Sequence, residues 1–339
     1  MSVLKIYILF AVLFSGSACP ADAFDVNKKL GRGINLGNAL EAPEEGQWGV
    51  VLKEDYFKLI RQAGFNSVRI PIRWSAHCLK QKPYTIDPNF LHRVDWAVKN
   101  AIFYDLYTII NIHHYEEIFE DPNEHKERFL AIWQQIAEHF KDCPQTVLFE
   151  FLNEPCKNLD DDKWNNLVDK VLKAVRKTNP ERTIIIGPTG WNSIDKLDKL
   201  LLPAEDRNII VTCHYYQPFH FTHQGASWVG EESKQWLGTK WTGTEKEKQE
   251  IKKDFDSAFE WGKKHNRPIY IGEFGSYSKA DIQSRVLWTG FIAREAEKRN
   301  FSWAYWEFCS YFGIYDSDAG KWRKELLEAL IPNTKTGVK

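Results

Sequence analysis

The sequence is poor in cysteine, and its few cysteines are widely spaced. It contains six, none of them in a Cys-x-x-Cys pair, so the spacing typical of a structural zinc site is missing. Loss of Cys19 with an N-terminal leader would leave an odd, sparse set of five, which is not the pattern of a disulfide scaffold. Cys213 and Cys309 fall in predicted strands, where we expect buried free thiols. The others are Cys78, Cys143 and Cys156.

The sequence also lacks any long block of charge of one sign. Its 45 Lys and Arg residues are balanced by 46 Asp and Glu residues, for a net charge of −1. Nucleic acids and anionic membrane surfaces are usually bound through an excess of basic residues. The composition therefore argues against both as the main partner.

A transmembrane segment is missing as well. The apolar run Ile6–Phe14 is too short for a bilayer, which needs ~20 residues. A lysine precedes this run and Ala21-Asp22-Ala23 follows it, the pattern of a secretory signal peptide. We expect cleavage near Ala23 and a secreted or periplasmic protein. Lipid anchoring at Cys19 is the less favoured alternative, because Gly16 stands where a lipobox usually has a larger aliphatic residue.

Neither an internal repeat nor a Ser-, Pro- or Thr-rich linker divides the rest of the chain, so we expect one domain over residues 24–339. Eight apolar runs alternate with amphipathic helical runs, and their continuous apolar middles are typical of parallel strands covered on both faces. The predicted strands are Arg32–Gly37, Ser67–Trp74, Tyr107–His114, Val147–Asn153, Thr183–Gly187, Asn208–Tyr216, Pro268–Glu273 and Ser302–Phe308.

This alternation predicts an α/β protein with a single (β/α)8 barrel, the TIM-barrel fold. A doubly wound open sheet is the alternative, but the glycines of Gly31–Gly37 lie before and within the first strand instead of opening a helix. The connection from Tyr216 to Pro268 is unusually long and aromatic, which indicates a cleft wall. Helices are predicted at Asp55–Ala63, Phe129–Phe140, Trp164–Val175, Phe255–Lys264 and Val286–Lys298.

Two glutamates stand at the ends of apolar runs, about 120 residues apart. Glu154 ends a run that begins near Phe149, and Glu273 ends one that begins at Pro268. The carboxyl ends of barrel strands converge on one face, where active sites lie. Two carboxyl groups at such a face are what cleavage of a glycosidic bond requires.

Other polar and aromatic residues gather at the same strand ends, a pattern that indicates a site. Arg69 would favour the ionised form of a nucleophilic carboxylate, and that negative carboxylate would raise the pKa of the neighbouring acid. Asn153 can donate to a sugar 2-hydroxyl, and Tyr216 can hold the nucleophile oxygen. The remaining candidates at strand ends are Asn38, Glu41, His113, His114, His214 and Trp306.

Several nearby residues have a simpler interpretation. Glu150 lies deeper in its strand than Glu154, and Glu307 should point away from Trp306, so we expect both to be structural carboxylates. A metal site is a further alternative, but neighbouring histidines at one strand end seldom ligate the same ion. The residues that would form it are His113, His114, Glu116, Glu117 and His125.

Taken in order, these motifs resemble glycoside hydrolase family 5, the cellulase-type group of retaining barrel glycosidases. The matching pieces run from Val68-Arg69-Ile70-Pro71 through Asn153-Glu154-Pro155 to Gly272-Glu273-Phe274-Gly275. The resemblance implies Glu154 as acid/base and Glu273 as nucleophile, without cofactor or metal. It implies supporting roles for Arg69, His113, Asn153, His214, Tyr216 and Trp306.

Two further stretches are similar to the single-domain endoglucanases of thermophilic bacteria, some of which also cut mannans. They are Gly33–Pro43 and Phe221–Trp228. This similarity implies sugar-binding roles for Asn38, Glu41, His114, His223 and Trp228.

We therefore expect a monomeric, retaining endo-β-1,4-glucanase acting on cellulose-like and mixed-linkage glucans and on glucomannan. A β-1,4-mannanase on the same scaffold is the first alternative. A non-catalytic polysaccharide-binding barrel is an alternative of another class, although such a protein needs no acid and nucleophile pair. A metal-dependent hydrolase is the last, and insensitivity to chelators would exclude it.

Overall fold

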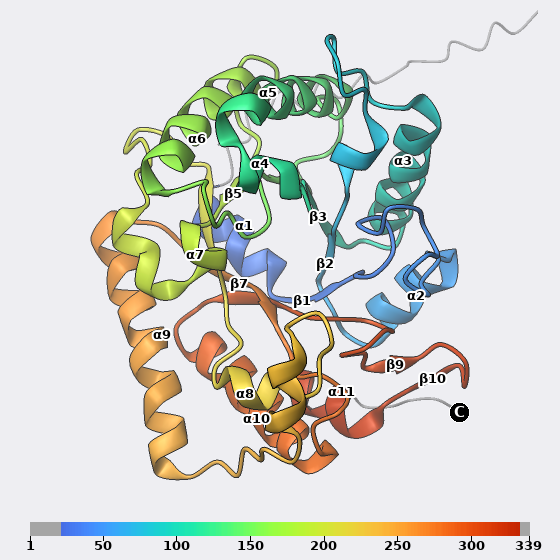
Figure 1. Cartoon of the computed structure of the whole chain (residues 1–339), viewed down its shortest axis with the longest axis vertical. Coiled ribbons are helices and arrows are strands. Elements are labelled where there is room, and N and C mark those ends of the chain that lie inside the picture. Colours follow the sequence, from blue (N-terminus) through green and yellow to red (C-terminus); the bar gives the residue numbers. More distant parts are fainter. Residues whose placement is uncertain (1–21, 333–339) are drawn as a thin grey trace, which may run out of the picture.

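The computed structural model describes residues 22–332, and a closed barrel of eight parallel strands forms its centre (Figure 1). Each strand pairs with its sequence neighbours, and β8 pairs with β1 to close the barrel. This confirms the predicted (β/α)8 architecture. The strands are β1 (Arg32–Asn35), β2 (Ser67–Ile70), β3 (Tyr107–Asn111), β4 (Val147–Glu150), β5 (Ile184–Ile186), β6 (Ile209–His214), β7 (Ile269–Phe274) and β8 (Ser302–Tyr305).

Helices surround the barrel, and every predicted helix is present. All five begin earlier than their apolar spacing indicated. The two largest differences are in α5, which starts at Pro122 after an Asp121 cap, and in α9, which starts at Glu245 after a Thr244 capping box. The main helices are α1 (Ala23–Leu30), α2 (Glu54–Gln62), α3 (Pro88–Phe103), α5 (Pro122–His139), α6 (Asp161–Arg176), α9 (Glu245–His265), α10 (Ile282–Lys298) and α11 (Lys324–Leu330).

Short elements fill the connections. No helix among residues 22–332 has the length and apolar character needed to cross a membrane. The short elements are α4 (Glu116–Glu120), α7 (Thr189–Asn192), α8 (Phe219–Thr222), the 3-10 turns η1 (Trp74–His77), η2 (Ile194–Lys199) and η3 (Glu231–Trp236), and the antiparallel pair β9 (Tyr315–Asp316) and β10 (Lys321–Trp322).

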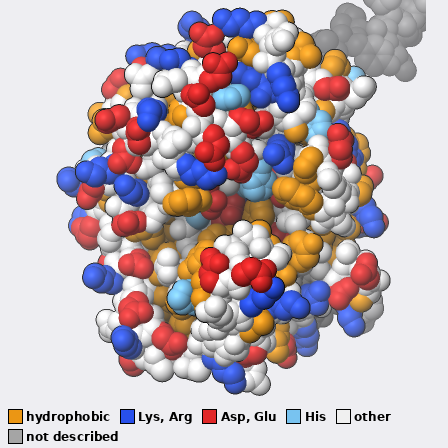
Figure 2. All heavy atoms as spheres, viewed as in Figure 1, with side chains coloured by type: hydrophobic (Ala, Val, Ile, Leu, Met, Phe, Trp, Pro, Cys, Tyr) orange, Lys and Arg blue, Asp and Glu red, His pale blue; other side chains and the backbone are white. Residues whose placement is uncertain are grey.

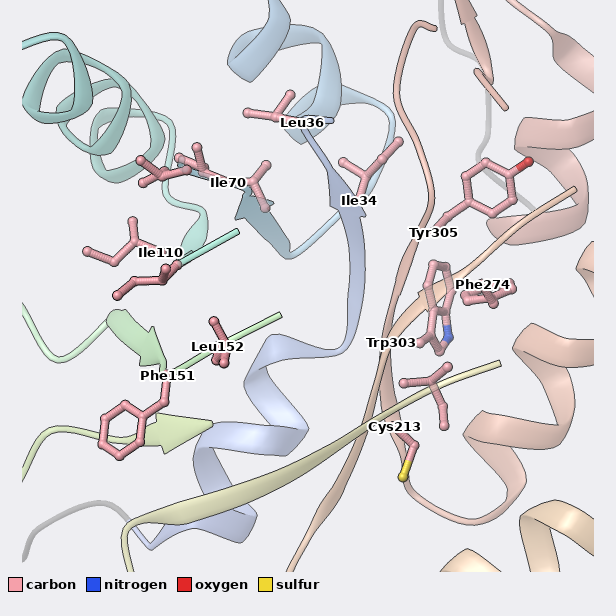
Figure 3. Close-up of a cluster of buried hydrophobic side chains, with 14 of the residues drawn as sticks. Ile34, Leu36, Ile70, Ile110, Phe151, Leu152, Cys213, Phe274, Trp303 and Tyr305 are labelled. Atoms are coloured by element: carbon pink, nitrogen blue, oxygen red, sulfur yellow. The ribbon is translucent and has the colours of Figure 1, made fainter. Parts of the chain in front are cut away.

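Two hydrophobic layers hold the barrel. Side chains such as Ile34, Ile70 and Ile110 face the helices and form the larger outer layer (Figure 3). A smaller cluster fills the barrel interior, and Val26 and Leu30 of α1 belong to it. Helix α1 therefore closes the N-terminal end of the barrel and leaves the carboxyl end free for a site.

Seven of the eight barrel strands end earlier than predicted, whereas β7 runs one residue further, to Phe274. β3 ends at Asn111 and β8 at Tyr305, and His113, His114 and Trp306, which come soon after them, line the cleft. Cys213 lies in β6 and is buried as expected, but Cys309 lies beyond β8 and is only partly buried, so its strand assignment was wrong. All five described cysteines are free thiols. Residues 1–21, including Cys19 and most of the predicted signal peptide, lie outside the described part of the chain.

Arg182, which is 1% exposed, ties the end of α5 to the start of β4. Its guanidinium donates to five main-chain carbonyls, so we expect Arg182→Met to lower the free energy of unfolding by about 3 kcal/mol, since buried carbonyls would lose their partners. Urea unfolding, with exposed Lys177→Met as control, measures this; equal midpoints for the two variants would contradict it. The carbonyls are those of Phe140, Lys141, Cys143, Pro144 and Val147.

Candidate active site

The carboxyl end of the barrel opens into a cleft of about 530 Å³. Figure 2 shows the molecule hollowed near its middle, with acidic and hydrophobic side chains around the hollow. Eleven of the thirteen predicted site residues line this cleft, while Arg69 and His214 are buried beneath it. The lining residues are Asn38, Glu41, Trp48, His113, His114, Asn153, Glu154, Tyr216, His223, Trp228, Glu273, Trp306, Tyr311 and Phe312.

Arg69 is the centre of the buried polar network under the cleft. Its Nε and Nη2 form a two-pronged pair with Glu150, both at 2.6 Å. Nη1 donates to Glu273 Oε1 at 2.6 Å and to Asn35 Oδ1 at 2.8 Å, and Nη2 also donates to Asn153 Oδ1 at 2.7 Å. All five N–H groups of the guanidinium are therefore used, and Glu150 is the buried structural carboxylate that we predicted.

Glu273 is held by two donors on its two oxygens. Arg69 donates to Oε1, and the Tyr216 hydroxyl donates to Oε2 at 2.9 Å. Tyr216 therefore contacts the nucleophile candidate as predicted. Burial raises the pKa of Glu273, while His214 and Arg69 act in the opposite direction. The strand carries a bulge here, since Cys213 pairs with Ile271 and His214 with Glu273, and such bulges re-aim side chains beside active sites.

Glu154 has a different environment. It follows β4 in a left-handed conformation with φ of 50°, and its Oε1 lies 2.8 Å from His214 Nδ1. Burial raises the pKa of Glu154 to about 7, against the opposing effect of Arg69. A raised pKa was expected, but burial and not the charge of Glu273 is its main cause, so that part of the prediction was wrong.

A carboxylate oxygen of Glu154, one of Glu273 and a ring nitrogen of His214 lie within 4.8 Å of one another. Such a set has the spacing of a metal site, but its atoms already have protein partners: Arg69 and Tyr216 on Glu273, and His214 on Glu154. A cation there would also face the Arg69 guanidinium. The arrangement fits an acid and a nucleophile better than a metal centre. Within residues 22–332, the residues of the alternative metal site that follow β3 do not form a cluster with the spacing of metal ligands. They are His113, His114, Glu116, Glu117 and His125.

Asn153, His113 and Trp306 form one side of the cleft floor. The Asn153 carbonyl oxygen is occupied by Arg69, which leaves its amide N–H groups for a ligand. His113 stacks on Trp306 with ring centroids 5.7 Å apart, and Asn111 Nδ2 lies 3.2 Å from His113 Nδ1. Burial keeps the pKa of His113 well below its usual range, so the ring is neutral and Nε2–H is its donor.

Asn38 and Glu41, which follow β1, line the cleft beside Trp306. The Glu41 carboxyl accepts from the main-chain N–H groups of Asn38 and Ala39. Burial raises the pKa of Glu41 to about 8, so it is mostly a neutral carboxylic acid at pH 7. Glu41 thus offers a hydroxyl donor to the cleft, which sequence reasoning did not foresee.

The opposite rim is aromatic. Trp228 is 54% exposed and packs against Tyr277 and Tyr311, with centroids 5.0 and 6.0 Å away. His223 stacks on Phe219 at 4.2 Å. The long connection before α9 therefore does form a wall, as predicted.

Three lining residues were not among the predicted ones: Trp48, Tyr311 and Phe312. Trp48 lies in the loop after β1 and meets the edge of His114 at 5.4 Å, whereas the other two follow β8. Loop residues carry no strand periodicity, so only their aromatic character could have indicated them. Glu307, by contrast, is buried and accepts from main-chain N–H groups of Cys309, Ser310 and Phe312, which confirms its predicted structural role.

A parallel barrel whose carboxyl end holds two facing glutamates is the architecture of a barrel glycosidase. Residues 30–311 match the family model described as cellulase, glycosyl hydrolase family 5. The chain belongs to this family.

Known relatives agree with this assignment. Endoglucanase H of Acetivibrio thermocellus is 41% identical over 324 residues, which are 94% of this chain and 34% of the relative. Two structures of Thermotoga maritima Cel5A, described in complex with mannotriose and with cellobiose, each share 55% identity and a TM-score of 0.90, covering 91% of this chain and all of theirs. The chain spans about a third of the length of Endoglucanase H and of Cellulase/esterase CelE.

Tyr216→Phe tests how Glu273 is held. Hydrogen bonds to a charged group contribute ~1.5–3 kcal/mol, so we expect hydrolysis of a soluble β-glucan to fall about tenfold or more. The hydroxyl favours the ionised Glu273, and its loss raises that pKa, so the acid limb of the pH–rate profile moves to higher pH. Tyr215→Phe is the matched control, because the Tyr215 hydroxyl binds Asp254 outside the cleft. Identical profiles for the two variants would count against this role.

Proposed function

We propose that the chain is a retaining endo-β-1,4-glucanase that hydrolyses cellulose-like and mixed-linkage β-glucans, with glucomannan as a further substrate. The observation that carries the proposal is the separation of the two carboxyls, whose oxygens lie within 4.8 Å. Retaining glycosidases hold their carboxyls ~5 Å apart, whereas inverting ones leave ~6.5–9.5 Å for a water. This separation favours direct attack by one carboxylate.

The environments of the two groups assign the roles. Glu273 has two donors on its oxygens and acts as the nucleophile that attacks the anomeric carbon. Glu154, with its pKa near 7, donates a proton to the leaving oxygen and then removes one from the water that hydrolyses the glycosyl-enzyme. Arg69 keeps Glu273 ionised and Asn153 faces the sugar with its amide.

The shape of the cleft supports internal cleavage of a chain. The hollow is open at the surface in Figure 2, and Trp228 and Tyr311 stand half exposed at its rim. Flat aromatic faces of this kind suit sugar rings. A β-mannanase is the second candidate because the Thermotoga relative is described with mannotriose as well as cellobiose, but the named relatives are endoglucanases.

We also propose that the protein acts outside the cytoplasm as a monomer. The support for the location is the signal-peptide pattern of residues 1–23. Cleavage near Ala23 would release the chain at the start of α1, whose first residue is Ala23.

Glu273→Ala is expected to abolish hydrolysis and to leave folding and glucan binding in place, because the covalent step needs this carboxylate. The assay is reducing-end release with viscosity on carboxymethyl cellulose, mixed-linkage β-glucan, glucomannan and galactomannan. We expect a fast viscosity drop on the glucans for the wild type. The exposed Glu232→Ala variant is the control and should match the wild type.

Wild-type activity in Glu273→Ala would refute the nucleophile assignment. A folded wild type that binds glucan and cuts none of the four polymers would favour the non-catalytic barrel. Faster cleavage of galactomannan than of any glucan would favour the mannanase.

The pH–rate profile should be bell-shaped. Glu154 must be protonated to act as an acid, and its pKa is about 7, so activity is present below this pH and is lost as the pH rises through it. On the acid side activity is lost as Glu273 becomes protonated. Glu154→Gln should still cleave an aryl cellobioside with a dinitrophenolate leaving group, which needs no proton, and its rate should show no alkaline limb. An alkaline limb that survives in this variant would contradict the assignment of Glu154.

A further inference from the structure

The turn that follows β5 has an unusual backbone. Gly190, Trp191 and Asn192 have φ of 66°, 60° and 57°, so three consecutive residues are left-handed, a conformation that side chains other than Asn and Asp seldom adopt. The N–H of Trp191 donates to the carbonyl of Pro155 at 3.3 Å, which fixes the turn against the residue directly after Glu154.

This backbone directs the Asn192 side chain inward. Asn192 is fully buried, and its Nδ2 lies 3.2 Å from Nε2 of His214. Gly187 at the end of β5 provides the room, because a Cβ there would overlap the Asn192 amide. Within residues 22–332, Asn192 is the one hydrogen-bond partner found for this ring nitrogen.

The protonation of the other ring nitrogen of His214, Nδ1, determines whether Nε2 donates or accepts the hydrogen bond with Asn192. His214 Nδ1 lies 2.8 Å from Glu154 Oε1, and an ionised carboxylate can only accept, so Nδ1 must carry a proton whenever Glu154 is ionised. Burial lowers the pKa of His214 to about 4, so the ring has a single proton near neutral pH. Nε2 is then a bare acceptor and needs a donor, which the Asn192 amide supplies.

We propose that Asn192 is a positioning residue for the acid/base: it holds His214 in the tautomer protonated on Nδ1, and this donor at Oε1 keeps the acidic proton of Glu154 on Oε2, for the leaving oxygen. The alternative tautomer would present a lone pair to Glu154 and draw its proton toward the histidine. The inference rests on the role of Glu154 in the proposed function and extends it by one residue.

The tautomer can be measured without any activity assay. Long-range ¹H–¹⁵N correlation spectra of the full chain with ¹⁵N-labelled histidine, assigned with His214→Gln, report which ring nitrogen is protonated. We expect a neutral ring protonated on Nδ1 in the wild type. Asn192→Asp replaces the donor by an acceptor and should place a proton on Nε2. A wild-type ring protonated on Nε2, or an unchanged ring in Asn192→Asp, overturns the proposal.

Kinetics test the consequence for the proton. Asn192→Gly removes the amide at a position where glycine suits the backbone, and we expect kcat/KM on β-glucan to fall about tenfold, a fraction of the usual benefit of general acid catalysis. For dinitrophenyl β-cellobioside, which needs no proton, we expect a change under about twofold. Asn266→Gly is the matched control, since Asn266 is also left-handed (φ 50°) but caps α9. Equal losses on both substrates, or no loss, overturn the proposal.

Glu154→Ala is run beside these variants to separate the two hypotheses. It should show the same selectivity between the two substrates, only larger. If it shows none, the proposed role of Glu154 fails, while the spectra still decide whether Asn192 sets the His214 tautomer.

Discussion

The site depends on one buried cation. Arg69 uses all five of its N–H groups on Asn35, Glu150, Asn153 and Glu273, so a single side chain of β2 fixes groups from β1, β4 and β7. A buried charge is tolerated only when its partners are complete. Glu273, the Asn153 amide and the structural carboxylate Glu150 therefore cannot be moved independently of one another.

The same network separates the chemistry of the two glutamates. Glu273 meets a guanidinium and a phenol hydroxyl, both of which favour its ionised form. Glu154 meets a neutral imidazole as its hydrogen-bond partner. Burial raises the pKa of both carboxyls, but only Glu273 has a cationic hydrogen-bond partner that acts against this effect. Two identical side chains less than 5 Å apart thus acquire different proton affinities from their surroundings, which is the general way in which acid and base roles are divided.

The sequence was sufficient to predict the barrel, because parallel strands covered on both faces read as continuous apolar runs. It was sufficient for the strand-end residues too, since position in a barrel strand determines which face a side chain reaches. Helix α3 was not predicted, although its buried residues Val94, Ala97, Val98 and Ala101 follow helical spacing and Asp87 and Pro88 mark its start. Asn192 was missed for another reason: its role depends on a left-handed turn and on contact with His214, 22 residues away.

Properties that depend on how deeply a side chain is buried, such as the pKa of a carboxyl group, could not be predicted from the sequence. Burial raises the pKa of Glu41, and the nearby Glu307 adds to this effect. The sequence alone does not indicate how deeply a carboxyl in a loop will be buried. The aromatic rim at Tyr311 and Phe312 is a similar case, because it forms only once the segment after β8 folds over the cleft.

The position of α1 has a practical consequence for how the enzyme can be attached to other things. Because this helix closes the end of the barrel remote from the cleft, a group joined to its first turn is attached on the side opposite the cleft. A surface or carrier domain tethered there would hold the barrel with its open face outward. Long, stiff polymer chains could then reach the cleft of an immobilised molecule without meeting its support.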